Sequence, residues 1–125
     1  MKIALTSIHV KDPIAAHRFY TEVLGFVSRM YMPEMNLAIV VAADEPDGTG
    51  LLLEPSDNPI GRAYMEGVYA GGMPALVLGT TDVQADYERL TAKGVVFREP
   101  PTRTDWGVQA VFEDTCGNLI QITQM

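Results

Sequence analysis

The feature that most constrains the fold is a pattern that occurs twice in the sequence. Residues 8–26 and 78–96 each begin with a strand-like run that ends in an aspartate, continue through a helical pattern and close on a glycine. The two aspartates, Asp12 and Asp82, lie 70 positions apart, and the two glycines lie 69 positions apart. A repeat of this length predicts two copies of one supersecondary module, whose sheets together can enclose a cavity. We therefore expect the residues that carry function in the walls of that cavity.

The composition is that of a globular protein. The chain has 125 residues, of which 47% are hydrophobic and 20% are charged. A chain of this length buries enough surface to fold as one domain, 1–125, without disulfides or a structural metal. The net charge of −7 and the absence of any Lys/Arg run argue against nucleic acid as a partner.

The single cysteine and the lack of long apolar segments predict a cytoplasmic protein without a membrane partner. Cys116 cannot form an intramolecular disulfide, and no signal-peptide pattern opens the chain. Because Cys116 lies in a turn sequence with no histidine nearby, we interpret it as an ordinary turn thiol rather than a nucleophile.

The pattern of apolar residues predicts an α+β fold made of two tandem βαβββ modules. Asp12 and Asp82 are predicted helix N-caps, and Pro13 suits the first helical position. Module one spans 1–55, a connector spans 56–73, and module two spans 74–125. The expected strands are 3–10, 26–31, 36–42, 50–54, 74–78, 95–98, 108–113 and 119–123.

The connector is rich in glycine and proline and contains Tyr64 and Tyr69. It is long for a simple link between modules, and loops that cover a binding site share these features. Both interpretations, a plain connector and a lid, remain open at this point.

Two motifs resemble the vicinal oxygen chelate superfamily, which includes glyoxalase I, bleomycin resistance proteins and extradiol dioxygenases. The first is Val10-Lys11-Asp12 followed by Phe-Tyr-Thr-Glu-Val-Leu-Gly-Phe at 19–26, and the second is Phe-Glu-Asp-Thr-Cys-Gly-Asn-Leu-Ile-Gln-Ile at 112–122. The resemblance covers almost the whole chain. It implies that the two curved sheets form a cup that binds a small molecule, commonly in a homodimer.

The resemblance also implies where the metal ligands of the superfamily's metalloenzymes would fall. The four positions carry over to Leu5, Glu54, Ala75 and Gln121. Leu5 and Ala75 have no donor atoms, and the neutral amide of Gln121 is a poor anchor for a divalent ion. We therefore expect a member that needs no metal or other cofactor.

Glu54 and His9 are the candidate catalytic residues. Alternation places Leu52 and Glu54 on one strand face and the neighbouring leucines on the other, so that Glu54 faces the cup if those leucines pack on a helix. There it could act as a general base or bind a cationic ligand, and His9 could donate or accept a hydrogen bond at neutral pH. The alternatives are a solvated carboxylate at a strand end and a half-exposed histidine. The candidate ligand-binding residues are Ser7, Leu52, Gln121, Thr123, Trp106 and Tyr64.

Three functions remain compatible with these residues. The first is a metal-independent protein that binds a small organic molecule, either as a pure binder or as an enzyme that uses Glu54 and His9. The second is a divalent-metal lyase or dioxygenase with a displaced ligand set of His9, Glu54 and Gln121. The third is sequestration of a cationic drug, with which the net charge of −7 is compatible.

Overall fold

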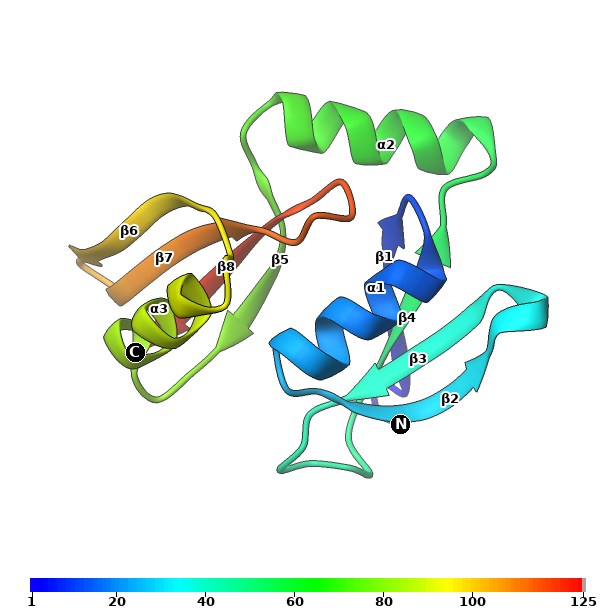
Figure 1. Ribbon diagram of the computed structural model, residues 1–125, viewed down its shortest axis with the longest axis horizontal. Helices are drawn as coiled ribbons and strands as arrows, with labels where there is room; N and C mark the ends of the chain where they lie inside the picture. Colours follow the sequence, from blue (N-terminus) through cyan, green and yellow to red (C-terminus); the bar gives the residue numbers. More distant parts are fainter. Residues whose placement is uncertain (125) are drawn as a thin grey trace. The chain divides into compact units, whose positions relative to one another are not determined.

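A computed structural model describes residues 1–124, and the chain divides into two compact units, Met1–Met65 and Glu66–Met125. Each unit contains one four-stranded mixed sheet, as Figure 1 shows. The predicted α+β class and the two tandem βαβββ modules are therefore confirmed. No helix within residues 1–124 is long and apolar enough to cross a membrane.

The first unit is built on sheet A, whose strands lie in the order β1-β4-β3-β2. β1 and β4 are parallel, whereas β3 is antiparallel to both β4 and β2. The elements are β1 (Leu5–Val10), α1 (Pro13–Arg18), the π-helical turn η1 (Phe19–Val23), β2 (Val27–Met32), the 3-10 turn η2 (Pro33–Met35), β3 (Leu37–Val41) and β4 (Gly50–Pro55).

The first helix begins at the predicted cap but changes geometry early. The Asp12 side chain accepts a hydrogen bond of 3.0 Å from the amide of Ile14, and Pro13 follows at the first helical position. The Thr21 hydroxyl donates to the His17 carbonyl at 2.7 Å, and the Leu24 amide reaches back to the Phe19 carbonyl. This side-chain bond competes for the helix backbone, which accounts for the π-helical turn where one regular helix was predicted.

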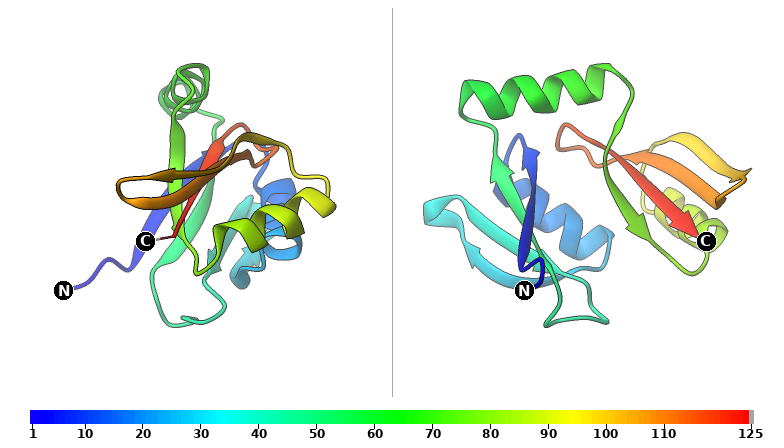
Figure 2. Two further views of the ribbon diagram at one scale, coloured as in Figure 1. Left: turned by 90° about the vertical axis from the view of Figure 1, so that its left-hand side faces the viewer. Right: turned by 180° about the vertical axis from the view of Figure 1, so that it is seen from behind.

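The core of the first unit lies between α1 and one face of sheet A. The right-hand view of Figure 2 shows the sheet with α1 behind it. The buried apolar side chains come from β1, β3, β4 and the helical segment, and they are Ile8, Val10, Ala16, Tyr20, Ala38, Val40, Leu51 and Leu53. The opposite face of sheet A carries side chains that stay at least partly accessible to solvent.

The second unit repeats this arrangement in sheet B, with the strand order β5-β8-β7-β6. Asp82 caps the second helix by accepting from the Ala85 amide at 3.0 Å. Val83 and Leu90 of that helix are buried, as are Ala110, Phe112, Ile120 and Ile122 of the sheet. The elements are β5 (Pro74–Gly79), α3 (Val83–Ala92), β6 (Phe97–Thr104), β7 (Gly107–Glu113) and β8 (Leu119–Gln124).

The connector contains a helix that the sequence analysis did not predict. α2 spans Pro59–Ala70, and the boundary between the two units falls inside it, after Met65. Asn58 caps this helix by accepting from the Gly61 amide at 2.7 Å, and Pro59 occupies the first turn. The glycines at 61 and 67 obscured the helical period, because glycine is a poor helix former on average. The lid role remains a hypothesis.

Candidate functional site

The accessible face of sheet A, called here the open face, brings the first group of candidate residues together. Leu51 and Leu53 are 7% and 0% exposed on the helix side, whereas Leu52 and Glu54 are partly accessible on the other, as the alternation predicted. The strand register places Ser7 beside Leu52, Leu52 beside Ile39, and Ile39 beside Met30. The open face is therefore formed by Leu5, Ser7, His9, Met30, Ile39, Leu52 and Glu54.

His9 and Glu54 are cross-strand neighbours at one end of the open face. They are Cα partners in the parallel β1–β4 pair, and His9 Nε2 lies 3.9 Å from Glu54 Oε2. Their side chains are 25% and 41% exposed, so both are within reach of a dissolved molecule. The two side chains can form an ion pair when the imidazole is protonated.

The first turn of α2 covers the imidazole of His9. A β-carbon at Gly61 would lie 2.7 Å from His9 Cδ2 and 2.9 Å from Nε2, closer than β-carbons approach other heavy atoms in proteins. Tyr64, one turn further along, presents its ring edge to His9 with 6.2 Å between the ring centroids and stays 61% exposed. The absence of a side chain at Gly61 is thus what allows helix and imidazole to meet.

The four positions that the superfamily's metalloenzymes use do not provide a donor set in this chain. Leu5 pairs with Gly50, and Glu54 lies four residues further along β4, about 13 Å away at strand spacing. In the second unit, Ala75 lies at a register irregularity of β5, and Gln121 pairs with Val77. Within residues 1–124 no group of three or more His, Cys, Asp or Glu side chains is placed to hold a metal ion. The four carried-over positions thus offer at most two donor side chains, Glu54 and Gln121.

In the second unit, Gln121 and Thr123 belong to a polar network on sheet B. Gln121 Nε2 donates to Thr123 Oγ1 at 2.9 Å and to Gln109 Oε1 at 3.5 Å. Gln109 Nε2 in turn donates to Glu99 Oε1 at 3.1 Å. Sequence reasoning did not single out Gln109 or Glu99. The signal that could have found Gln109 is a polar residue within the otherwise apolar β7. In the structure it pairs with Thr123 of β8.

A second polar cluster in this unit was also missed. The Tyr69 hydroxyl of α2 donates a short hydrogen bond to Glu113, and Arg98 Nη2 donates to the same two residues at 3.0 and 3.3 Å. The hydrogen bond with Tyr69, and next the charge of Glu113, raise the pKa of the Arg98 guanidinium above its usual range. The cluster joins α2 to β6 and β7, so we assign it a structural role.

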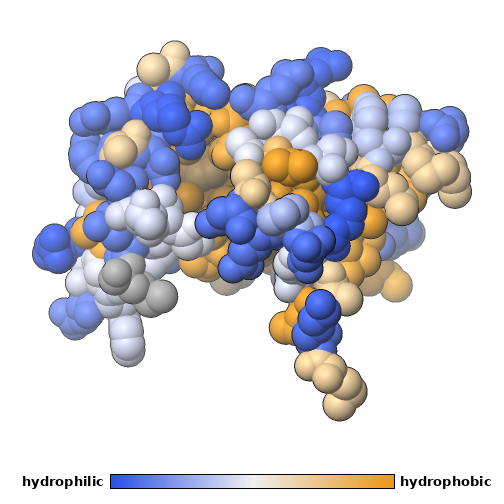
Figure 3. Space-filling model, turned by 90° about the horizontal axis from the view of Figure 1, so that it is seen from below, coloured by the Kyte–Doolittle hydropathy of each residue, from blue (hydrophilic) through white to orange (hydrophobic). Residues whose placement is uncertain are grey.

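Trp106 lies in the turn between β6 and β7 and is 81% exposed. Its backbone amide donates to Thr104 Oγ1 at 3.1 Å, which orders the turn. On the face of the molecule seen in Figure 3, hydrophobic and hydrophilic residues are interspersed. An indole exposed to this degree can stack on a ligand or anchor an interface with another molecule.

His17 packs against the edge strand β2. Its ring stacks on Tyr31 at 3.9 Å between centroids, and Nε2 lies 3.0 Å from Ser28 Oγ. Burial lowers the pKa of His17 from its ordinary value of 6.5, and the nearby Glu22 partly opposes this.

The lowered pKa of His17 predicts how the stability of the protein depends on pH. The imidazole of His17 binds a proton more readily in the unfolded chain than in the folded protein. Neutral His17 therefore gives its full contribution to stability above pH 6.5. The free energy of unfolding falls as the pH drops through the pKa of the folded state. His17→Gln should reduce this loss between pH 7.5 and 5, measured by urea unfolding. An unchanged pH dependence in the variant would contradict the assignment, and His9→Gln serves as the control.

Comparison with known proteins agrees with the fold and the motifs. The family model described as the Glyoxalase/Bleomycin resistance protein/Dioxygenase superfamily matches residues 2–122. The chain belongs to this superfamily. An uncharacterised superfamily relative of Bacillus subtilis (strain 168), YurT, is 45% identical over 99% of both chains.

Two solved structures extend the comparison. The crystal structure of UcmS2 has a TM-score of 0.83 and 30% identity, covering 100% of this chain and 98% of its own. That of TnmS3, an antibiotic binding protein from Streptomyces sp. CB03234, has a TM-score of 0.75 and 30% identity, covering 99% of this chain and 95% of its own. This member of the superfamily is thus similar over its full length to a protein that binds an antibiotic.

Proposed function

We propose that this superfamily member binds a small organic molecule on the open face of sheet A without a catalytic metal. The observation that carries the proposal is the His9–Glu54 pair, 3.9 Å apart and accessible, at the end of a largely apolar strand face. A mostly apolar surface with a few convergent polar groups is what small-molecule sites generally offer.

The apolar part of the site suits a ligand with an aromatic or aliphatic body. Leu5, Met30, Ile39 and Leu52 lie on the open face, and Leu5 and Met30 are 46% and 43% exposed. Methionine adapts its shape to different ligands because its side chain is flexible and polarizable. Glu54 would accept a hydrogen bond from a cationic or N–H group at one end of the ligand.

Sequestration is the mode of action that we favour. The likeness to TnmS3, an antibiotic binding protein, at 30% identity over nearly the whole chain supports it. Gln121, Thr123 and Trp106 in the second unit stay candidate ligand contacts, and the proposal does not depend on them.

A metal-independent enzyme is the second candidate, favoured by the proximity of His9 and Glu54. Glu54 would take a proton from the bound molecule, and His9 would stabilise the carboxylate or return a proton. Recovery of the ligand unchanged after prolonged incubation, measured by mass spectrometry, distinguishes storage from turnover.

A metal-dependent lyase or dioxygenase is the alternative that the donor set supports least, since Leu5 and Ala75 offer no donor atoms. Elemental analysis after exposure to Ni²⁺, Zn²⁺, Mn²⁺ and Fe²⁺ tests it directly. Tightly held, near-stoichiometric metal would overturn the metal-independent proposal.

Substitution of Glu54 by glutamine tests the site itself. The probes are dansylcadaverine, in which a fluorescent aromatic group is joined to a cationic alkyl amine, and its neutral N-acetyl derivative. We expect Glu54→Gln to weaken dansylcadaverine binding about tenfold, the effect of one charge-assisted hydrogen bond, and to leave the neutral probe unaffected. Glu34→Gln, at an exposed position in η2, removes the same charge and is the matched control.

Two results would count against the site. Equal losses in the Glu54→Gln and Glu34→Gln variants would mean that only net charge matters. Failure of both dansyl probes to bind the wild-type protein saturably would overturn binding on the open face.

We further propose that the protein is a cytoplasmic homodimer. Val27 and Tyr31 of the edge strand β2 are 45% and 41% exposed, and a second copy of the chain could cover this apolar surface. Cys116 is the single cysteine of the sequence and is buried, so the chain cannot form an intramolecular disulfide, which suits a reducing compartment. Light scattering coupled to gel filtration tests the dimer.

A further inference from the structure

We propose that Arg29 forms an anion-recognising subsite at the end of the open face opposite to Glu54. This inference rests on the proposed function and deepens it, because it states the chemical class of the ligand. That ligand would carry a carboxylate, phosphate or similar anionic group in addition to its apolar body.

The guanidinium of Arg29 is fixed by two backbone carbonyls of the loop before β4. Nη2 donates to the Gly48 carbonyl at 2.7 Å and to the Pro46 carbonyl at 3.0 Å. Arg29 itself lies at a register irregularity of β2, between Ser28 and Met30. A guanidinium held in this way keeps its charge and loses little freedom on binding an anion.

The second terminal nitrogen of Arg29 lies over the open face at Gly50. A β-carbon at Gly50 would be 3.0 Å from Arg29 Nη1, 3.0 Å from Ile39 Cγ2 and 3.1 Å from Leu5 Cδ1. Nη1 therefore lies beside the apolar side chains of the open face, above a residue with no side chain of its own. A larger residue at this position would crowd the guanidinium.

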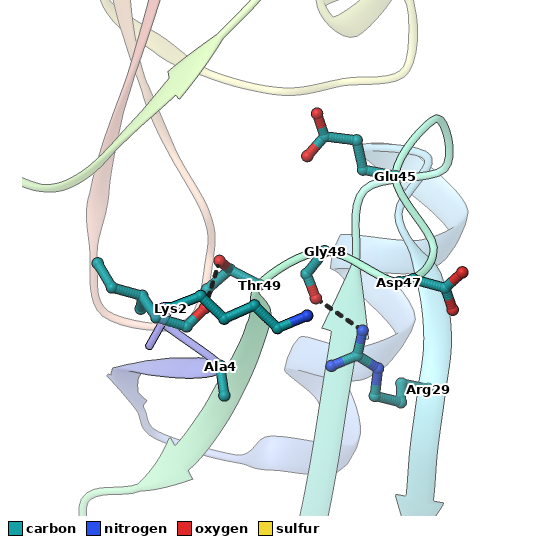
Figure 4. Close-up of a pocket in the computed structure, with 8 residues that line it drawn as sticks. Lys2, Ala4, Arg29, Glu45, Asp47, Gly48 and Thr49 are labelled. Carbon is teal, nitrogen blue, oxygen red and sulfur yellow. Dashed lines mark hydrogen bonds between the residues drawn. The ribbon is translucent and has the colours of Figure 1, made fainter.

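A pocket of about 650 Å³ opens beside the same guanidinium, so there is space for a ligand group. Its lining includes Lys2, Arg29, Glu45 and Asp47. In Figure 4 the ammonium of Lys2 and the guanidinium of Arg29 extend toward one another, whereas the carboxylate of Asp47 extends away from both. The two cationic groups can thus act on one anion.

The two ends of the open face give the ligand its dimensions. Gly50 and Glu54 are four residues apart on β4, a distance of about 13 Å along a strand. An anionic group at Arg29, an apolar body over Leu52 and a hydrogen-bond donor at Glu54 would fill this length. The structure thus favours elongated amphoteric molecules over wholly cationic or wholly neutral ones.

The test compares two dyes that share one aromatic body. 8-Anilinonaphthalene-1-sulfonate carries an anionic group, and N-phenyl-1-naphthylamine lacks it. We expect the wild-type protein to bind the sulfonate about tenfold more tightly, the effect of one charge-assisted hydrogen bond. Added salt should reduce that preference, because an exposed ion pair is screened.

The variants are Arg29→Gln, Arg29→Lys and, as a matched control, Arg103→Gln at an exposed position of β6. Arg29→Gln should abolish the preference for the sulfonate while leaving the affinity for the neutral dye unchanged, which also shows that the apolar surface is intact. Arg29→Lys should retain part of the preference, and Arg103→Gln should retain all of it.

The outcomes separate this inference from the proposed function. If both dyes bind equally well, or if Arg29→Gln leaves the preference unchanged, the anion subsite is wrong and binding on the open face stands. If neither dye binds saturably, the proposed function itself fails.

Discussion

Replacing Leu53 by alanine is expected to lower the free energy of unfolding by about 2–5 kcal/mol, the usual cost of a cavity in a packed core. Leu53 is 0% exposed and lies in β4, which pairs with both β1 and β3. α1 packs on this face of the sheet, so the space left by the side chain lies inside a packed core. Urea unfolding followed by circular dichroism measures the change.

The matched control is the same substitution one residue away. Leu52 lies on the open face, so Leu52→Ala should cost about 1 kcal/mol or less in stability. It should instead weaken binding of N-phenyl-1-naphthylamine about fivefold, since it removes apolar contact area from the proposed site. Equal destabilisation by the two variants would contradict the assignment of the two faces.

The second large effect is expected at Asp114, which is 0% exposed. Asp114 Oδ1 accepts from the amides of Cys116 and Asn118 at 2.7 and 3.0 Å, and Oδ2 accepts from Asn118 Nδ2 at 3.1 Å. Asp114→Ala leaves these buried donors without their acceptor, at about 1–3 kcal/mol for each. We therefore expect a loss of about 3 kcal/mol or more in the free energy of unfolding.

Two further variants make this expectation specific. Asp114→Asn keeps one oxygen acceptor, so its loss of stability should lie between that of the wild type and that of Asp114→Ala. The side-chain NH2 group that replaces the second oxygen cannot accept from Asn118 Nδ2. Asp105→Ala, in the exposed turn before β7, should change stability by about 0.5 kcal/mol or less. If Asp114→Ala were as mild as Asp105→Ala, the turn would owe its shape to other contacts.

Local patterns were sufficient to predict most of the fold. The helix starts at Asp12 and Asp82 follow from capping chemistry, which involves only residues two or three positions away. The faces of β4 follow from strand alternation, which is equally local. The helix in the connector was missed because its glycines are unfavourable on average, and only the contact of Gly61 with His9 explains one of them.

The candidate site was predicted in part. Glu54 and His9 were proposed from strand faces, but their pairing depends on the β1–β4 register, which no local pattern specifies. Gln109 and Glu99 entered the network of Gln121 through the register of sheet B, for the same reason. The sequence pattern did not single out Arg29, because an arginine in an exposed strand indicates no binding site until its partners are known.

The sequence by itself determined the repeated βαβββ order, the capped helices, the buried strand faces and the lack of donor atoms at Leu5 and Ala75. These properties depend on the kind of residue at each position and on neighbours within one helical turn or one strand. Only the tertiary structure decided that Glu54 lies beside His9, whereas Leu5 of the same strand lies beside Gly50. It also decided that the guanidinium of Arg29 lies next to Gly50. Such contacts join residues up to 45 positions apart, and the strand register that brings them together is a property of the assembled sheet.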